Sequence, residues 1–146
     1  MGETKLSAPP PVKGDVELCY ESDMAVLYFH RRTKMLHHQL RGFLHGKEFR
    51  QLMEAGLSTL KTRRACKWLS DDRLNGPITA ADEEWSKKNW TPRAMQAGWK
   101  YWAIVFPEKV LGQMNMRRWI EAHVDKGLTA QGFADPDEAR QWLEKL

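Results

Sequence analysis

Two aspartates and an arginine that directly follow an apolar run are the residues of this chain best suited to chemistry. Asp71, Asp72 and Arg73 come immediately after Ser70 and residues 65–69, a run with the composition of a buried strand. A guanidinium pairs with a carboxylate through two parallel hydrogen bonds, so Arg73 suits the recognition of an acidic group. Two carboxylates are also typical of general acid–base pairs and of sites for hard cations.

The alternative to a recognition site is a structural ion pair that fixes the loop after the strand. Consecutive side chains of extended backbone point to opposite faces, so Asp71 and Asp72 are not expected to share one role. An acid–base pair or a metal site made by both carboxylates is therefore not predicted.

Seven tryptophans lie beyond residue 67, and several of them fall near the two aspartates and the arginine in the predicted order of elements. Three occupy predicted core positions, and Trp99 and Trp102 are expected on opposite sides of one strand. Others lie on short polar helices, where they form either the wall of a pocket or a roof over the core. The predicted ligand- or partner-binding residues are Trp68, Ser70, Asp71, Asp72, Arg73, Trp85, Trp90, Arg93 and Trp102.

The remaining polar residues match no known catalytic or metal-binding spacing. The five histidines do not follow a zinc motif, and the adjacent His37 and His38 face apart on a strand. The chain contains neither a glycine-rich phosphate loop nor a Gly-x-Ser-x-Gly elbow. Cys19 and Cys66 are expected to be reduced, buried thiols. We therefore expect no metal and no other cofactor.

The first half of the chain reads as three strands and a helix. Apolar residues mark strands at 16–20, 24–30 and 35–43, and the short polar turns between them predict an antiparallel meander. Helical spacing of apolar residues predicts a helix at 47–61, which is followed by the buried strand at 65–69.

The second half alternates helices and strands. Thr79 is predicted to cap a short helix, Thr91 to cap a second that Gly98 ends, and Asp135 to cap the last. Between them lie a strand at 101–106, a helix at 110–126 and a strand at 128–133. This alternation favours parallel strands with right-handed crossovers. The sequence therefore predicts a single α/β domain, with a mixed sheet flanked by helices, over residues 15–146.

Composition restricts the classes of partner. The net charge of +4 is a mild excess whose basic clusters fall at predicted turns and helix ends, which speaks against a nucleic-acid partner. No apolar run approaches the roughly 20 residues that a membrane helix needs. Residues 1–14 are polar and rich in proline, so we expect a disordered or extended tail and a cytoplasmic protein.

Several short patterns, taken in order, resemble the SpoIIAA-like group of STAS and Sec14-like small bacterial domains. They are Gly42-Phe43, Glu48-Phe49, Lys67 to Arg73, Glu84-Trp85, Trp90, Pro92-Arg93, Ala97-Gly98, Phe133-Ala134-Asp135, Glu138-Ala139 and Trp142-Leu143. The resemblance implies a mixed sheet flanked by helices and a role in regulation or ligand sensing. Some members are switched by phosphorylation of a serine after a core strand, where Ser70 stands here. Their Asp-Ser-Ser-Gly pattern is missing, so that switch is not carried over.

These observations together predict a non-enzymatic regulatory or interaction module. It would bind a small apolar or anionic ligand or a protein partner, and a homodimer is also compatible with the sequence. A first alternative is a lipid- or membrane-surface-binding module that uses the helix around residues 114–119. A second is a small enzyme in which an aspartate acts as general base.

Overall fold

In the described part of the chain, six strands pair in the order in which they occur along the sequence, and they form one central sheet. The computed structural model describes residues 15–146, so the predicted tail at residues 1–14 lies outside the described residues. The strands are β1 (Val16–Glu21), β2 (Ala25–His30), β3 (Met35–Leu40), β4 (Lys67–Asp71), β5 (Tyr101–Val105) and β6 (Thr129–Phe133). β1 to β3 are antiparallel, and each later strand runs parallel to its neighbour. The predicted α/β class and mixed sheet are confirmed.

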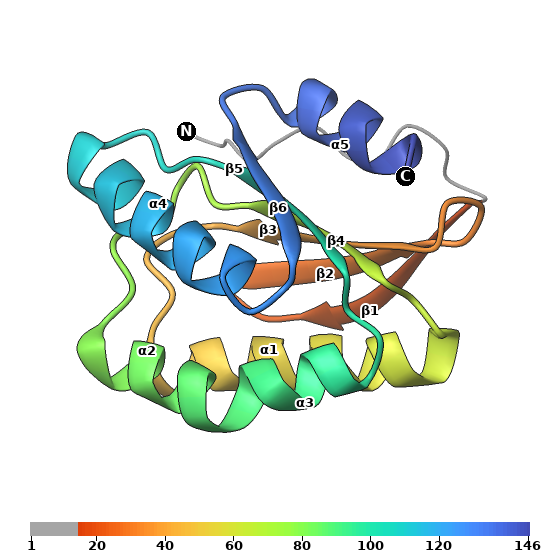
Figure 1. Ribbon diagram of the computed structural model, residues 1–146, viewed down its shortest axis with the longest axis horizontal. Helices are drawn as coiled ribbons and strands as arrows, with labels where there is room; N and C mark the ends of the chain where they lie inside the picture. Colours follow the sequence, from red (N-terminus) through yellow and green to blue (C-terminus); the bar gives the residue numbers. More distant parts are fainter. Residues whose placement is uncertain (1–14) are drawn as a thin grey trace.

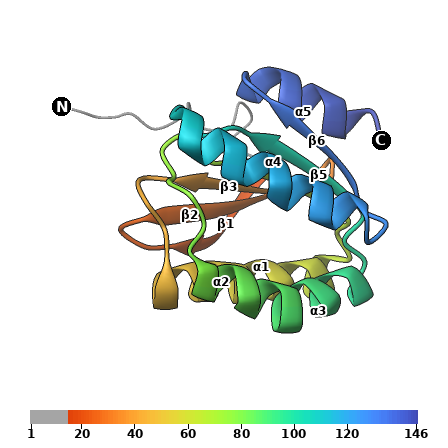
Figure 2. The same cartoon turned by 60° about the vertical axis from the view of Figure 1, so that its left-hand side comes forward.

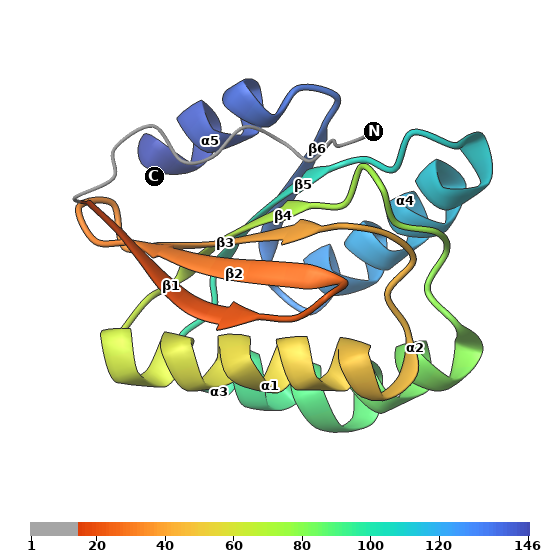
Figure 3. The same cartoon turned by 180° about the vertical axis from the view of Figure 1, so that it is seen from behind.

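Helices cover both faces of this sheet (Figures 1 and 2). One face carries α1 (Gly46–Arg63), α2 (Ala80–Trp85), α3 (Thr91–Gln96) and α4 (Val110–Val124). The other face carries α5 (Pro136–Glu144), which packs on β4, β5 and β6. Viewed from behind, α1 runs along the sheet below β1, β2 and β3 (Figure 3). Among the helices of residues 15–146, none has the length and apolar character needed to cross a bilayer.

Two of the three predicted helix N-caps are confirmed. The Thr79 hydroxyl accepts a hydrogen bond from the backbone N–H of Asp82, and the Asp135 carboxylate accepts one from Asp137. The prediction that Thr91 caps a separate helix is wrong. Its N–H bonds to the carbonyl of Ser86, because a π-helical turn at Ser86–Trp90 joins α2 to α3 without a break.

Three further predictions are corrected. The buried strand runs from Lys67 to Asp71 rather than from 65 to 69, so Asp71 belongs to the strand. Gly98, at φ +115°, ends α3 as predicted. Trp99 and Trp102 are expected on opposite sides of one strand, but their rings are in contact on the same side of the sheet. Trp99 precedes β5, and side chains alternate between the two faces only inside a strand. The two cysteines, Cys19 and Cys66, are free but half-buried rather than buried.

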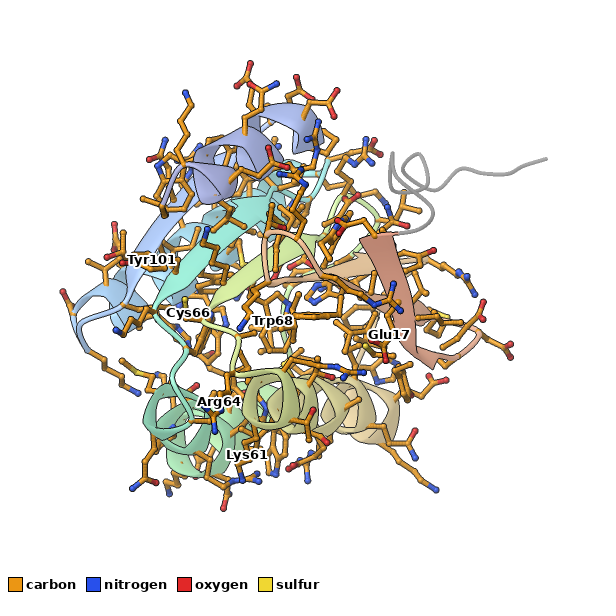
Figure 4. All side chains as sticks on the ribbon, turned by 90° about the vertical axis from the view of Figure 1, so that its right-hand side faces the viewer. Glu17, Lys61, Arg64, Cys66, Trp68 and Tyr101 are labelled. Carbon is orange, nitrogen blue, oxygen red and sulfur yellow. The ribbon has the colours of Figure 1, made fainter. Side chains whose placement is uncertain are left out.

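The larger core lies between the sheet and helices α1 to α4, and Trp68 is at its centre. The Trp68 side chain is 2 % exposed, and it lies in the space between β4 and α1 (Figure 4). Gly56 of α1 packs directly against it, since a Cβ built on Gly56 would come within 2.1 Å of the indole. A smaller core beneath α5 contains Met35, Leu69 and Leu143.

Candidate functional site

Strand β4 divides its side chains between the two cores. Trp68 and Ser70 face α1 to α4, while Leu69 and Asp71 face α5. Asp72, the first residue after the strand, also lies on the side of α1 to α4. The parallel register places His38 of β3 beside Ser70, and Trp102 of β5 beside Trp68. Three neighbouring strands therefore present aromatic and polar groups to the same space. We call the side of the sheet toward α1 to α4 the cavity face and the opposite side the α5 face.

A contiguous group of indole rings forms much of the cavity face. Ring centroids are 5.5 Å apart for Trp68 and Trp90, 5.3 Å for Trp90 and Trp99, and 5.5 Å for Trp99 and Trp102. The rings of these pairs meet at 79°, 65° and 63°, which is the edge-to-face geometry that aromatic rings prefer. Trp119 of α4 adds a half-buried fifth ring.

These rings border a cavity between the sheet and the helices. The space open to the centre of a water-sized sphere is about 60 Å³, enough for roughly four water molecules. Apolar side chains such as Leu52 and Met116 complete the walls. The polar lining residues are His38, Ser70, Asp72, Asn75, Ser86 and His123.

A hydrogen-bond chain fixes the protonation state of His38. Trp68 Nε1, which can only donate, lies 3.0 Å from His38 Nδ1, so Nδ1 accepts and the ring proton is on Nε2. His38 Nε2 then donates to Asp72 Oδ1 over 2.8 Å. A second proton on His38 would face the indole N–H, so the ring is neutral. The Asp72 carboxylate is thus oriented by an uncharged donor.

His123 of α4 is the second neutral imidazole at the cavity. Its Nδ1 donates to the carbonyl of Trp119 over 2.8 Å, and its Nε2 accepts from the hydroxyl of Thr91 over 3.2 Å. Burial lowers the pKa of His123 to about 4. The bond to Thr91 joins α4 to the first residue of α3 across the cavity wall.

Two buried donors of the lining residues have no hydrogen-bond acceptor. Trp68, Trp90 and Trp102 donate their indole N–H groups to His38, to the carbonyl of Met53 and to Ser70 Oγ, respectively. The N–H of Trp99 and the hydroxyl of Ser86 have no partner, although their residues are only 4 % and 1 % exposed. Buried polar groups are rarely left unpaired, and one-turn π segments such as the one containing Ser86 are frequent at functional sites.

Asp71 and Arg73 pair with each other on the α5 face. Arg73 Nε donates to Asp71 Oδ1 over 3.0 Å and Arg73 Nη2 to Oδ2 over 2.9 Å, in the two-bond geometry expected of the pair. This bond raises the pKa of Arg73. The arrangement matches the structural alternative, in which the guanidinium fixes the loop after the strand.

Arg93 and Trp85 also lie away from the cavity. Arg93 makes a bidentate pair with Glu54 of α1 at the surface, over 3.0 and 2.6 Å. Trp85 packs against Phe49 and under the guanidinium of Arg50, where it lines an open depression. Of the nine predicted site residues, the structure therefore brings together Trp68, Ser70, Asp72, Trp90 and Trp102 at one cavity.

Five residues that line the cavity are not among the predicted site residues, namely His38, Ser86, Trp99, Trp119 and His123. Two of them carried a usable signal. His38 alternates with Leu36 and Leu40, so it is a polar residue on an apolar strand face, and His123 follows Trp119 at helical spacing. Ser86 carried no such signal, because the π-helical turn that buries it breaks ordinary helical periodicity.

The helix proposed for lipid contact is divided between core and surface. Met116 is buried and Trp119 half-buried, whereas Val110, Leu111 and Met114 in its first turns are exposed.

Within residues 15–146, no group of three or more His, Cys, Asp or Glu side chains is arranged to hold a metal ion. Comparisons of the chain with protein-family models, with curated proteins and with solved structures give no match.

Proposed function

We propose that this protein is a non-enzymatic binding module of SpoIIAA-like type that holds a small molecule in its tryptophan-lined cavity. The observation that carries the proposal is the pair of unpartnered donors, Trp99 Nε1–H and Ser86 Oγ–H, in a wall that is mostly apolar. A buried donor without an acceptor costs about 1–3 kcal/mol, and a ligand oxygen would remove that cost. Apolar walls with a few convergent polar groups are typical of ligand sites.

Nuclear magnetic resonance of the indole N–H protons tests this proposal directly. The full-length protein is screened with small neutral, cationic and anionic molecules while the seven indole signals are followed. A ligand that accepts from Trp99 moves its signal and raises the melting temperature. The Trp142 signal, on the α5 face against Phe133, stays in place and serves as the internal control.

Matched variants complete the test. Trp99→Phe assigns the Trp99 signal and removes the donor while keeping an aromatic ring, so it should weaken binding of any hit at least fivefold. Trp142→Phe should leave binding unchanged. If no molecule of any charge class moves the Trp99 signal, the cavity is part of the core and the proposal is wrong.

A small enzyme that uses Asp72 as general base is a second candidate, since one carboxylate oxygen of Asp72 is oriented by His38 at the cavity. Both ring nitrogens of His38 are already engaged, by Trp68 and Asp72, which speaks against a proton shuttle through that ring. A screening hit that is recovered chemically unchanged after prolonged incubation with the protein favours the binding module. Conversion that Asp72→Asn abolishes favours the enzyme.

A further inference from the structure

Charge at the cavity comes from a single carboxylate. Of the described residues that line it, Asp72 is the one with an acidic side chain, and the imidazoles of His38 and His123 are neutral. The Asp72 side chain is 7 % exposed, and its one side-chain partner among residues 15–146 is His38. A carboxylate has about four acceptor positions, and burying it without a countercharge is costly.

The two arginines predicted to serve this region are committed elsewhere. Arg73 forms its two-bond pair with Asp71 on the α5 face, and Arg93 forms one with Glu54 at the surface. An anionic ligand would therefore meet the negative charge of Asp72 with no guanidinium to offset it. The electrostatics of the cavity favour a positive charge instead.

The walls suit a cation as well. An indole face attracts an ammonium group through its quadrupole, most strongly when both are removed from water. Trp68, Trp90, Trp99 and Trp102 are each at most 5 % exposed. Because adjacent rings meet at 63° to 79°, they form walls set at angles rather than a parallel stack.

The two unpartnered donors add a second requirement. Trp99 Nε1–H and Ser86 Oγ–H call for an acceptor on the ligand, which an alkylammonium ion alone does not supply. The space of about 60 Å³ would hold roughly four waters. Bonded atoms lie about half as far apart as hydrogen-bonded waters, so a compact molecule with somewhat more than four non-hydrogen atoms fits.

Resting on the proposed binding function, we propose that the ligand is a small methylated ammonium compound that also carries an oxygen acceptor. The ammonium group lies among the indole rings beside Asp72, and the oxygen accepts from Trp99 Nε1–H. Choline has this chemistry, and so does the head group of a methylated lysine presented next to peptide carbonyls.

Calorimetric titration of the full-length protein with choline tests the charge requirement. The matched probe is 3,3-dimethylbutan-1-ol, which replaces the nitrogen of choline by carbon and removes only the charge. We expect choline to bind at least tenfold more tightly than this alcohol. Equal affinities would overturn the cation proposal while leaving the binding module intact, whereas failure of every probe in the wider screen would overturn both.

Two neighbouring carboxylates supply the matched variants. Asp72→Asn keeps an acceptor for His38 and removes the charge, so it should weaken choline binding at least tenfold. Asp71→Asn, one residue away on the α5 face, should change it less than twofold. Unchanged binding by Asp72→Asn would contradict the proposal. Saturation transfer from the indole protons to the choline methyl protons, measured on the wild type, provides a readout that needs no variant.

Two further probes define the oxygen requirement and the source of the head group. Trp99→Phe should weaken the binding of choline. The same variant should change the affinity for tetramethylammonium, which lacks an oxygen, less than twofold. An equal loss of affinity for both probes would contradict the role of the oxygen. A trimethyl-lysine peptide that binds more tightly than choline would assign the head group to a protein partner, and the reverse order would assign it to a free small molecule.

Discussion

Asp71 and Asp72 are adjacent in the sequence, yet the two faces of the sheet place them in opposite environments. On the α5 face, Asp71 is held by two hydrogen bonds from Arg73. On the cavity face, Asp72 has only the neutral His38, and unpartnered donors lie on other residues that line the same space. The first face pairs its carboxylate within the chain, although His37 Nε2 on that face also lacks a partner. The second face leaves a carboxylate and two donors available to a ligand in one cavity.

The comparison shows which kind of polar group marks a site. A buried ion pair with complete hydrogen bonding is what a stable fold requires. Incompletely bonded polar groups in an aromatic cavity oppose stability, and they are more readily explained by ligand binding. Each face can be perturbed separately, and the expected effects differ in size.

The largest effect is expected in acid, where each face contains a buried neutral histidine. Burial lowers the pKa of His37, on the α5 face, to about 3 and that of His123, on the cavity face, to about 4. The unfolded chain, with histidine pKa near 6.5, binds more protons in this range, so the free energy of unfolding falls as pH falls. As the pH falls from 6.5 to 4, each histidine should lower the free energy of unfolding by about 3 kcal/mol.

Denaturant unfolding at a series of pH values measures this effect. His37→Gln and His123→Gln should each reduce the loss across that window, and the double variant should reduce it most. From pH 4 to pH 3 His37 should continue to destabilise the protein after the effect of His123 has levelled off. A pH dependence that neither variant alters would contradict the assignment.

Steric contact on the cavity face gives the second comparison. Gly56→Ala would place a Cβ within 2.1 Å of the Trp68 ring, and overpacking of this kind costs about 1–3 kcal/mol. Alanine is otherwise the better helix former, by about 1 kcal/mol, so a net destabilisation isolates the contact. Trp68→Phe in the Gly56→Ala background should cost less than in the wild type, as a double-mutant cycle would show. Purely additive effects would mean that the two residues do not constrain each other.

The carboxylates themselves give the third comparison. Arg73→Ala removes both guanidinium bonds from Asp71, which is 3 % exposed, and should lower the free energy of unfolding by about 2–3 kcal/mol. Asp72→Asn keeps an acceptor for His38 and removes a buried charge, so its effect should stay within about 1 kcal/mol. Chemical denaturation of the two variants and the wild type measures both changes in the free energy of unfolding. Equal losses would mean that the faces are satisfied to the same degree.

Much of the fold could be predicted from the sequence because local signals agree with it. Alternation gave the strand positions to within a few residues, and Thr79 and Asp135 marked helix starts through their side-chain caps. The site could be predicted only in part. Period-two alternation separates Asp71 from Asp72, but the choice of Arg73 as a partner for Asp71 rather than for a ligand depends on tertiary packing.

The residues missed at the site share a physical reason. Trp99 lies outside β5, in the turn after Gly98, and Ser86 lies in the π-helical turn, so neither follows the period of a regular element. His123 reaches the cavity only because α4 packs on the same face as α1. Such placements follow from how the elements pack together, which a local sequence pattern does not encode.

Two serines at the cavity should respond in opposite directions. Ser70 Oγ accepts from Trp102 over 2.8 Å, so Ser70→Ala leaves a buried indole N–H unpaired and should cost about 1 kcal/mol or somewhat more. The Ser86 hydroxyl has no partner, so Ser86→Ala should stabilise the unliganded protein by up to about 1 kcal/mol. Thermal unfolding without ligand measures both, and destabilisation by Ser86→Ala would show that its hydroxyl is already satisfied.

The smallest effect is expected at the surface pair of Arg93 and Glu54. Both side chains are more than two-fifths exposed, and solvent-exposed ion pairs contribute about 0–1 kcal/mol. Arg93→Ala should therefore lower the free energy of unfolding by less than about 0.5 kcal/mol. It should also raise the pKa of Glu54, which the bond from Arg93 now lowers. Choline binding should be unchanged, because Arg93 does not line the cavity. A variant that folds normally yet loses choline binding would place Arg93 in the site after all, and would undo the distinction between the cavity and its surroundings.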